Sequence, residues 1–167
     1  MKLELSLKNV LHIVGEKNSG KTTLTEKLIG ELASRGINVG SIKHSSHNHT
    51  LDKEGSDSDK FSKAGADPSV FATPAGSSIV ISGGNNNYND IINYIFSKND
   101  LVIVESFKSS KGKKLVITDN EEYLNILSNV IAVISSSFHP KHLPVFSFND
   151  YRLIEFIIKE FNLPLSR

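Results

Sequence analysis

One short segment carries the clearest chemistry in this chain: residues Gly15 to Thr22 read G-E-K-N-S-G-K-T. This is the pattern G-x-x-x-x-G-K-[ST], in which glycines let backbone N–H groups converge on phosphate oxygens. An apolar run precedes the pattern and a helix-forming segment follows it, so the helix directs the positive end of its dipole at the anion. We therefore predict a nucleotide-binding phosphate loop.

Each residue of this loop has an expected task. Gly15 makes the turn and Gly20 lets the backbone approach the phosphates. Lys21 is expected to reach the β and γ oxygens, and the Thr22 hydroxyl is expected to ligate Mg²⁺. The remaining positions are predicted to add amide, hydroxyl or phosphate contacts: Lys17, Asn18, Ser19 and Thr23.

Two carboxylates are candidates for the metal side of this site. A magnesium ion in a phosphate loop keeps several waters, which a carboxylate at the end of a neighbouring strand orients. Glu105 ends an apolar run, and Asp52 opens a D-x-x-G segment of the kind that senses a γ-phosphate in GTPases. We predict both at the metal with Thr22, and both as catalytic residues with Lys21. A plain surface glutamate and an ordinary loop aspartate are the alternatives.

Three histidines follow the second predicted strand: His44, His47 and His49. Their H-x-x-H-x-H spacing suits zinc or nickel, but the chain has no cysteine and no obvious fourth ligand. We prefer a polar loop that faces phosphate or a partner, with a metal site as the alternative. His12, inside a predicted strand, is expected to be packed.

Composition bounds the class of protein. The chain has 167 residues, 38% of them hydrophobic, and a net charge of +1, which favours a single soluble domain over residues 1–167. This charge gives no general attraction to nucleic acid or membranes, and no stretch approaches the apolar length of a membrane helix. The lack of cysteine fits a reducing compartment, so we predict a cytoplasmic protein.

The elements that must position these residues alternate between strands and helices. Strands are predicted at residues 10–14, 37–43, 101–104, 114–118, 130–134 and 145–148, with a hairpin at 68–72 and 78–82. Helices are predicted at 21–34 and 88–97. A short helix is predicted to follow a polar loop over 45–59 and to end at about Ala66, and a last helix follows a cap at Asn149 or Asp150. The order predicts an α/β class: a three-layer P-loop NTPase fold with a mostly parallel sheet and a β-hairpin extension.

Several segments together are more specific than the phosphate loop alone. They are G-E-K-N-S-G-K-T-T-L, I-K-H at 42–44, Gly55-Ser56-Asp57-Ser58, Ala64-Gly65-Ala66 and V-E-S-F-K at 104–108. In order and spacing, this chain resembles the molybdopterin-guanine dinucleotide biosynthesis adaptor family, MobB, over roughly its first 110 residues. Two positions depart from the family pattern, which usually has lysine in place of Ser56 and glycine in place of Ser106.

The resemblance implies a GTP-binding protein with weak Mg²⁺-dependent GTPase activity, usually a homodimer built through a shared sheet. It implies a role in assisting the transferase that attaches GMP to molybdopterin. Molybdopterin is then a ligand either of this chain or of that guanylyltransferase-type partner. On the matching positions, Lys43, His44, His47 and Lys108 would supply flanking polar contacts.

Guanine selection has no support in the sequence. No N-K-x-D-like segment is present, and Ser135-Ser136-Ser137 after a predicted strand could line a base pocket but carries no carboxylate for the N1 and N2 donors of guanine. Two other functions compete with the adaptor. One is a nickel-type metallochaperone GTPase that uses the histidines. The other is a small-molecule kinase, for which the chain's only arginines, Arg35, Arg152 and Arg167, are poorly placed.

Overall fold

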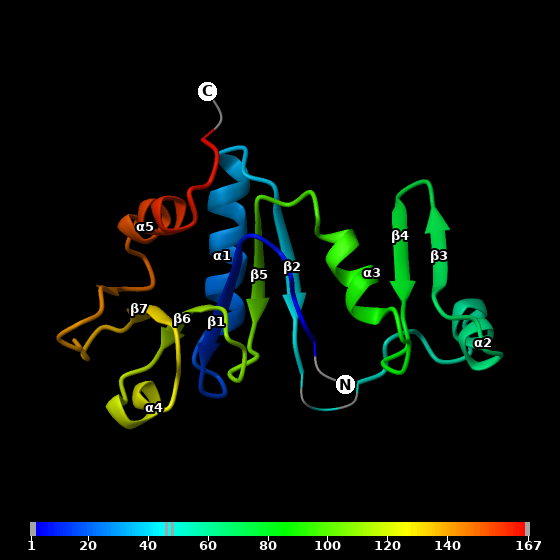
Figure 1. Ribbon diagram of the computed structural model, residues 1–167, viewed down its shortest axis with the longest axis horizontal. Coiled ribbons are helices and arrows are strands. Elements are labelled where there is room, and N and C mark those ends of the chain that lie inside the picture. The colour runs from blue at the N-terminus through cyan, green and yellow to red at the C-terminus, as the bar shows by residue number, and fades with distance from the viewer. Residues whose placement is uncertain (1–2, 46, 48, 166–167) are drawn as a thin grey trace. The chain divides into compact units, whose positions relative to one another are not determined.

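The computed structural model describes residues 3–45, 47 and 49–165. These residues form two compact units. We call them the sheet unit, Leu7–Ser45 with Phe96–Arg167, and the hairpin unit, Met1–Ser6 with Ser46–Ile95. All elements are labelled in Figure 1 where there is room.

The sheet unit is built on six parallel strands in the order β2-β5-β1-β6-β7-β8. The strands are β1 (Val10–Gly15), β2 (Val39–Lys43), β5 (Leu101–Glu105), β6 (Lys113–Ile117), β7 (Val130–Ile134) and β8 (Val145–Phe146). The central strands are buried along nearly their whole length, which explains their continuous apolar sequence. Because all strands run in one direction, their carboxyl ends meet at one edge.

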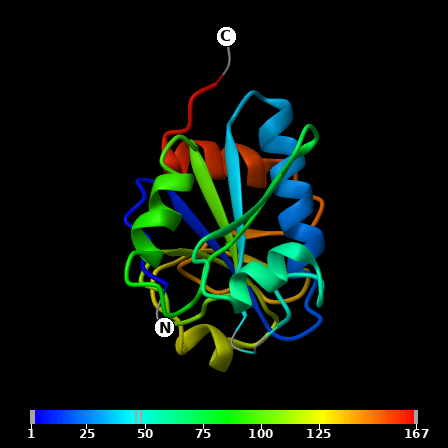
Figure 2. The same cartoon turned by 90° about the vertical axis from the view of Figure 1, so that its right-hand side faces the viewer.

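Helices cover both faces of this sheet. They are α1 (Lys21–Ser34), α4 (Glu121–Asn125) and α5 (Arg152–Phe161). Leu24 and Leu28 of α1 and Ile157 of α5 pack into one core with Ile13 of β1, whereas the next residue, Val14, belongs to a second core with α4. This alternation along β1 follows the two-residue period of a strand. Figure 2 shows α1, in blue, running beside the strands.

The hairpin unit contains α2 (Asp57–Lys63), the antiparallel strands β3 (Ser69–Thr73) and β4 (Gly76–Val80), and α3 (Tyr88–Ile95). The chain start is tied to α3, because Asn89 Oδ1 accepts from the backbone N of Glu4 at 3.0 Å. The hairpin leaves large apolar side chains exposed, among them Phe71 and Ile79. No helix in the described part of the chain has the length and apolar content needed to cross a membrane.

The fold class predicted from the sequence is confirmed: a mostly parallel α/β sheet with a separate antiparallel hairpin. The predicted span of α1 also agrees with the structure. The strand predicted at 37–43 begins only at Val39, because Ile37 N donates to Leu32 O and Gly36 N to Ala33 O to close α1.

Further boundaries were wrong: the hairpin strands predicted at 68–72 and 78–82 lie at Ser69–Thr73 and Gly76–Val80. The predicted loop over 45–59 ends earlier, since Ser56 Oγ accepts from Asp59 N at 3.2 Å and starts α2 at Asp57. The strand predicted at 145–148 keeps only two residues, and the helix predicted to reach residue 97 ends at Ile95. Helix α4 was missed, although Asn120 followed by two glutamates is a capping signal.

Candidate functional site

The carboxyl ends of the central strands bring the main candidate residues together. Gly15 ends β1, Lys43 ends β2 and Glu105 ends β5, with Lys43 directly opposite Glu105 in the pairing of the two strands. Ligands of parallel α/β sheets bind outside this edge. The sheet therefore places these three residues where a ligand site is expected.

The phosphate loop has the backbone that its glycines predict. A Cβ on Gly15 would lie 2.5 Å from Ser19 Oγ and 2.9 Å from the Ile117 carbonyl, so only glycine fits there. Gly20 has φ +87° and its Cα faces the Phe148 ring, where a Cβ would come within 2.8 Å. Asn18 is also left-handed, at φ 62°. These positions bend the chain sharply from β1 into α1.

The Lys21 side chain turns back over this bend. Its Nζ donates to the carbonyl oxygens of Gly15 at 3.2 Å and Glu16 at 2.6 Å. Burial lowers the pKa of Lys21, the carboxylate of Glu105 opposes that shift, and the positive charges of Lys108 and Lys43 add to it. The arrangement holds a cation at the start of α1, where the backbone amides also carry positive charge.

Thr22, Glu105 and Lys43 form one polar group beside Lys21. Thr22 Oγ1 donates to Glu105 Oε2 at 3.0 Å, and Lys43 Nζ lies 3.7 Å from Glu105 Oε1. Glu105 is only 9% exposed, so the carboxylate is fixed by its strand and by these contacts. A hydroxyl beside a carboxylate is a hard oxygen pair of the kind that Mg²⁺ prefers.

The loop after β5 holds an unusual backbone. Ser106 and Phe107 both have positive φ, 77° and 70°, and Ser106 N donates to Ile13 O at 2.8 Å. Ser106 is one of the two departures from the family pattern, and a serine here adopts the conformation that glycine takes freely. The Phe107 ring stacks on His44, with centroids 4.3 Å apart.

Two buried basic side chains support this loop from inside the sheet. Lys114 is 0% exposed, and its Nζ donates to the carbonyls of Ser110, Gly112 and Ser128. His12, as predicted, is packed at 2% exposed, and its Nε2 lies 2.8 Å from Ser110 Oγ. Burial, helped by the charge of Lys114, lowers the pKa of His12 from 6.5 to about 4. The imidazole is therefore neutral at physiological pH.

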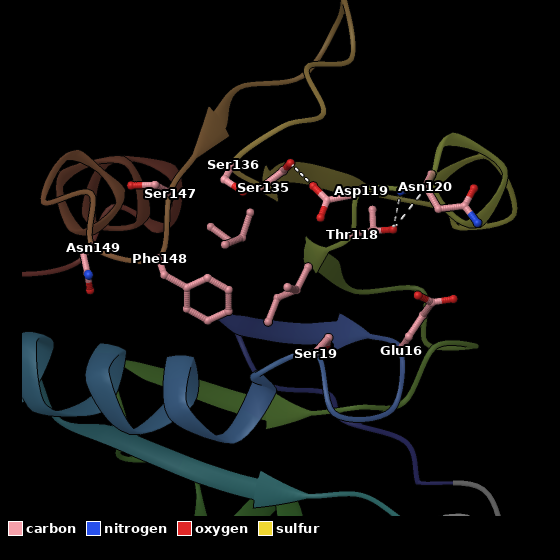
Figure 3. A pocket seen from close by; sticks show the side chains of 12 residues that line it. Glu16, Ser19, Thr118, Asp119, Asn120, Ser135, Ser136, Ser147, Phe148 and Asn149 are labelled. Atoms are coloured by element: carbon pink, nitrogen blue, oxygen red, sulfur yellow. Dashed lines mark hydrogen bonds between the residues drawn. The ribbon is translucent and has the colours of Figure 1, made fainter.

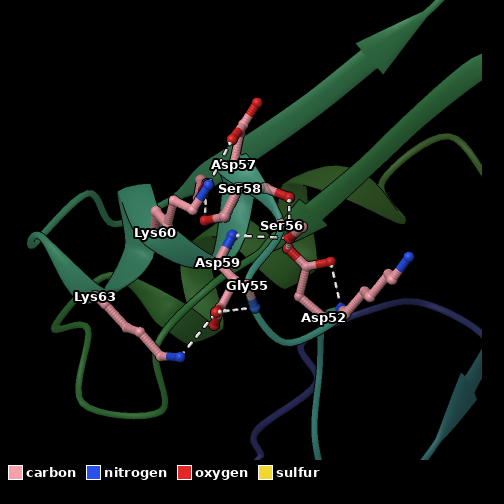
Figure 4. Close-up of polar contacts among 10 residues, drawn as sticks. Asp52, Gly55, Ser56, Asp57, Ser58, Asp59, Lys60 and Lys63 are labelled. Atoms are coloured by element: carbon pink, nitrogen blue, oxygen red, sulfur yellow. Dashed lines mark hydrogen bonds and ion pairs between the residues drawn. The ribbon is translucent and has the colours of Figure 1, made fainter.

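Asp52 belongs to the hairpin unit, where it organises its own turn (Figure 4). Its Oδ1 accepts from Lys53 N at 2.7 Å and its Oδ2 from Ser56 Oγ at 3.3 Å. Hydrogen bonding from Ser58 is the main cause that lowers the pKa of Asp52. In a GTPase-type D-x-x-G segment, the glycine N–H would contact the γ-phosphate. Here the Gly55 N–H donates to Asp59 Oδ2 at 2.8 Å. The metal role of Asp52 stays a prediction.

The other predicted residues lie in different surroundings. Lys17 and Thr23 are exposed, and Lys108 places Nζ 4.6 Å from the centre of the Tyr123 ring. His44 donates its backbone N to Glu105 O at 3.1 Å, while His47 and His49 are exposed. Across the described residues, no three His, Cys, Asp or Glu side chains gather in a way that could hold a metal ion. The nickel alternative thus gains no support.

A pocket of about 560 Å³ lies on the other side of the phosphate loop (Figure 3). It is lined by Glu16 and Ser19, by residues 117–120 at and after the end of β6, by residues 134–136 at and after the end of β7, and by residues 147–149 after β8. The segment Ser135-Ser136-Ser137 carries no carboxylate itself, but the structure places one beside it, Asp119 from the segment after β6. Asp119 accepts hydrogen bonds from Ser135 Oγ and, at 2.9 Å, from Ser137 Oγ. Its position directly after a buried strand was the available signal.

Comparison with known proteins agrees with this arrangement. The family model described as Molybdopterin guanine dinucleotide synthesis protein B, MobB, matches residues 10–136. A protein of Bacillus subtilis described as a probable molybdopterin-guanine dinucleotide biosynthesis adapter protein is 32% identical over 162 residues, covering 90% of this chain and 92% of its own. The adapter protein of Haemophilus influenzae is 40% identical over 114 residues, which is 67% of this chain and 64% of that protein.

Solved structures give the same result. The crystal structure of Bacillus subtilis MobB matches with a TM-score of 0.74 at 27% identity, covering 93% of this chain and 98% of that one. The residues that the family model matches, 10–136, include the phosphate loop, the strand that ends in Glu105 and the pocket residues up to Ser136. The chain therefore belongs to the MobB family.

Proposed function

We propose that this protein is a GTP-binding adaptor that assists the enzyme attaching GMP to molybdopterin, and that it hydrolyses GTP slowly with Mg²⁺. Its role lies in the biosynthesis of molybdopterin guanine dinucleotide, after which the family is named. The observation that carries the proposal is the geometry of the phosphate loop. Lys21 Nζ donates to the Glu16 carbonyl within the loop, and Thr22 Oγ1 donates to the Glu105 carboxylate. A homodimer and a guanylyltransferase-type partner belong to the same proposal.

The donor set fits the metal. Thr22 and Glu105 offer hard oxygens 3.0 Å apart at the start of α1, and Mg²⁺ bound there would neutralise phosphate charge. Lys21 would bind the β and γ oxygens, and Lys43 would balance the buried carboxylate from the outer side. Asp52 is proposed to reach the metal through water when GTP is bound.

Slow turnover follows from what surrounds these groups. A fast enzyme for phosphoryl transfer supplies an arginine that stabilises the developing charge. Arg35 pairs with Glu155, and Arg152 pairs with Asp150 at 2.6 Å, while Arg167 lies outside the described residues. We expect GTP turnover below about one per second, and a faster rate would count against an adaptor. The kinase alternative loses support for the same reason.

The test is a binding titration of the whole protein with GTP, ATP and molybdopterin, each with and without Mg²⁺. Lys21→Ala should weaken triphosphate binding at least about 100-fold, because the cation that faces the β and γ oxygens is lost. Lys159→Ala, which removes an exposed lysine in the last turn of α5, serves as the matched control and should bind normally. Unchanged GTP affinity in Lys21→Ala would contradict the assignment of the Gly15–Thr22 loop as the triphosphate site.

A further inference from the structure

The pocket beside the phosphate loop has one charged group, Asp119, among the lining residues that come from the ends of β6, β7 and β8. Its walls come from the ends of β6, β7 and β8, where hydroxyl and backbone groups surround the carboxylate of Asp119 (Figure 3). Two residues of the phosphate loop, Glu16 and Ser19, also line it. One ligand can therefore reach both the pocket and the loop, provided that it carries a phosphate chain and a flat polar group.

Asp119 is held in one orientation. Both serine hydroxyls, from Ser135 and Ser137, donate to its Oδ1. Ser135 is itself fixed, since its Oγ accepts from the backbone N of Ser137 at 3.1 Å and of Phe138 at 2.8 Å. Among the described residues, both side-chain hydrogen bonds to Asp119 reach Oδ1, and the backbone N–H groups of Ser137 and Phe138 also stabilise the carboxylate. Oδ2 accepts no side-chain hydrogen bond in this part of the chain, so it is the oxygen that a ligand can approach.

The two serine hydrogen bonds also lower the pKa of Asp119. The group is thus an ionised carboxylate at neutral pH, which accepts hydrogen bonds and donates none. Guanine presents two adjacent donors, its N1–H and its 2-amino group, and a carboxylate can accept from both. Adenine presents an acceptor at N1 beside its amino group, so it can form only one such bond. The pocket is therefore matched to guanine.

We propose that Asp119 is the residue that selects guanine, by accepting hydrogen bonds from the N1–H and 2-amino group of a nucleotide whose phosphates lie in the Gly15–Thr22 loop. This rests on the proposed function and adds its specificity. The same pair of donors occurs on a pterin ring. We favour the nucleotide because the pocket is continuous with the phosphate loop through Glu16 and Ser19.

The experiment exchanges the acceptor for a donor. In Asp119→Asn, the side-chain amide can donate to the oxygen that xanthine carries in place of the guanine amino group. GTP affinity should fall about 100-fold, because the guanine amino group loses its acceptor, and xanthosine triphosphate should become the preferred ligand. Asp100→Asn is the matched control, because Asp100 lies before β5 at the opposite edge of the sheet and accepts from Asn38 N. Its base preference should stay that of the original protein.

Further binding measurements distinguish guanine selection by Asp119 from phosphate binding by the Gly15–Thr22 loop. The original protein should prefer GTP to ATP by about 100-fold or more, and this ratio is informative even if Asp119→Asn folds poorly. Equal GTP and ATP affinity that still depends on Lys21 would overturn guanine selection and leave the phosphate loop standing. Binding of free pterin that depends on Asp119, with no preference among the triphosphates, would overturn the nucleotide assignment in favour of a pterin.

Discussion

The two sides of the ligand-facing edge are supported in opposite ways. On the β5 side, the loop after Glu105 has two left-handed non-glycine residues and is held by two buried basic side chains, His12 and Lys114. On the side of β6, β7 and β8, neutral serine hydroxyls hold one carboxylate, Asp119. The first side concentrates positive charge and backbone strain, whereas the second presents an acceptor in a relaxed loop.

Under the proposed function, this difference matches the two chemically unlike parts of a nucleotide. Phosphates require positive charge, and on the β5 side the charges of Lys43 and Lys108 act on Lys21. A base that donates hydrogen bonds requires a fixed acceptor, and this is the role proposed for Asp119. Strain and buried charge are tolerated on the first side because the surrounding strands hold the loop in place.

The largest effect is expected from Lys114. Replacing it in Lys114→Met leaves the carbonyls of Ser110, Gly112 and Ser128 without their charged donor, which should lower the free energy of unfolding by roughly 3–5 kcal/mol. Ser137→Ala, on the other side, should cost about 1 kcal/mol or less, since Ser137 is exposed. Urea denaturation measures both.

Lys111→Met controls for the loss of a nearby positive charge, because Lys111 is exposed and lies just before β6, the strand that contains Lys114. Equal destabilisation by Lys114→Met and Ser137→Ala would break the contrast between the two sides.

His12 should make the protein acid-sensitive. Its pKa is about 4 in the folded state against 6.5 unfolded, so the unfolded chain binds the extra proton between these values. Stability is therefore full above pH 6.5 and falls as the pH drops towards 4, by about 3 kcal/mol from this group. Thermal melts from pH 7.5 to 4 measure the slope.

His12→Gln is the variant to compare, because it keeps a polar group near Ser110 and cannot take up a proton. A variant whose melting temperature falls just as steeply between pH 6.5 and 4 would show that His12 is not the group responsible.

The smallest effect concerns the strained backbone. Ser106→Gly should raise the free energy of unfolding by about 1 kcal/mol, because glycine adopts φ 77° without the Cβ penalty. Ser109→Gly, at an exposed position of the same loop outside the left-handed region, should give no gain. If both substitutions destabilise equally, the strain assigned to the β5 side is not real.

Much of the sheet unit could be predicted from the sequence, because its signals are local. An apolar run such as 101–104 is buried on both faces in a parallel sheet, and the spacing of Leu24 and Leu28 fixes the buried face of α1. The phosphate loop was also readable, since its glycines are required by backbone geometry alone. Lys21, Thr22 and Glu105 lie together, while their roles towards phosphate and metal stay predictions.

The sequence by itself determined the strands, α1 and the bend between them, because backbone geometry and burial period are properties of neighbouring residues. Only the tertiary structure decided which distant groups meet. Asp119 and Ser135 follow two different strands, β6 and β7, that pair in the sheet, and Lys114 reaches carbonyls on two separate loops. Such contacts depend on strand order and register, which no local pattern of residues specifies.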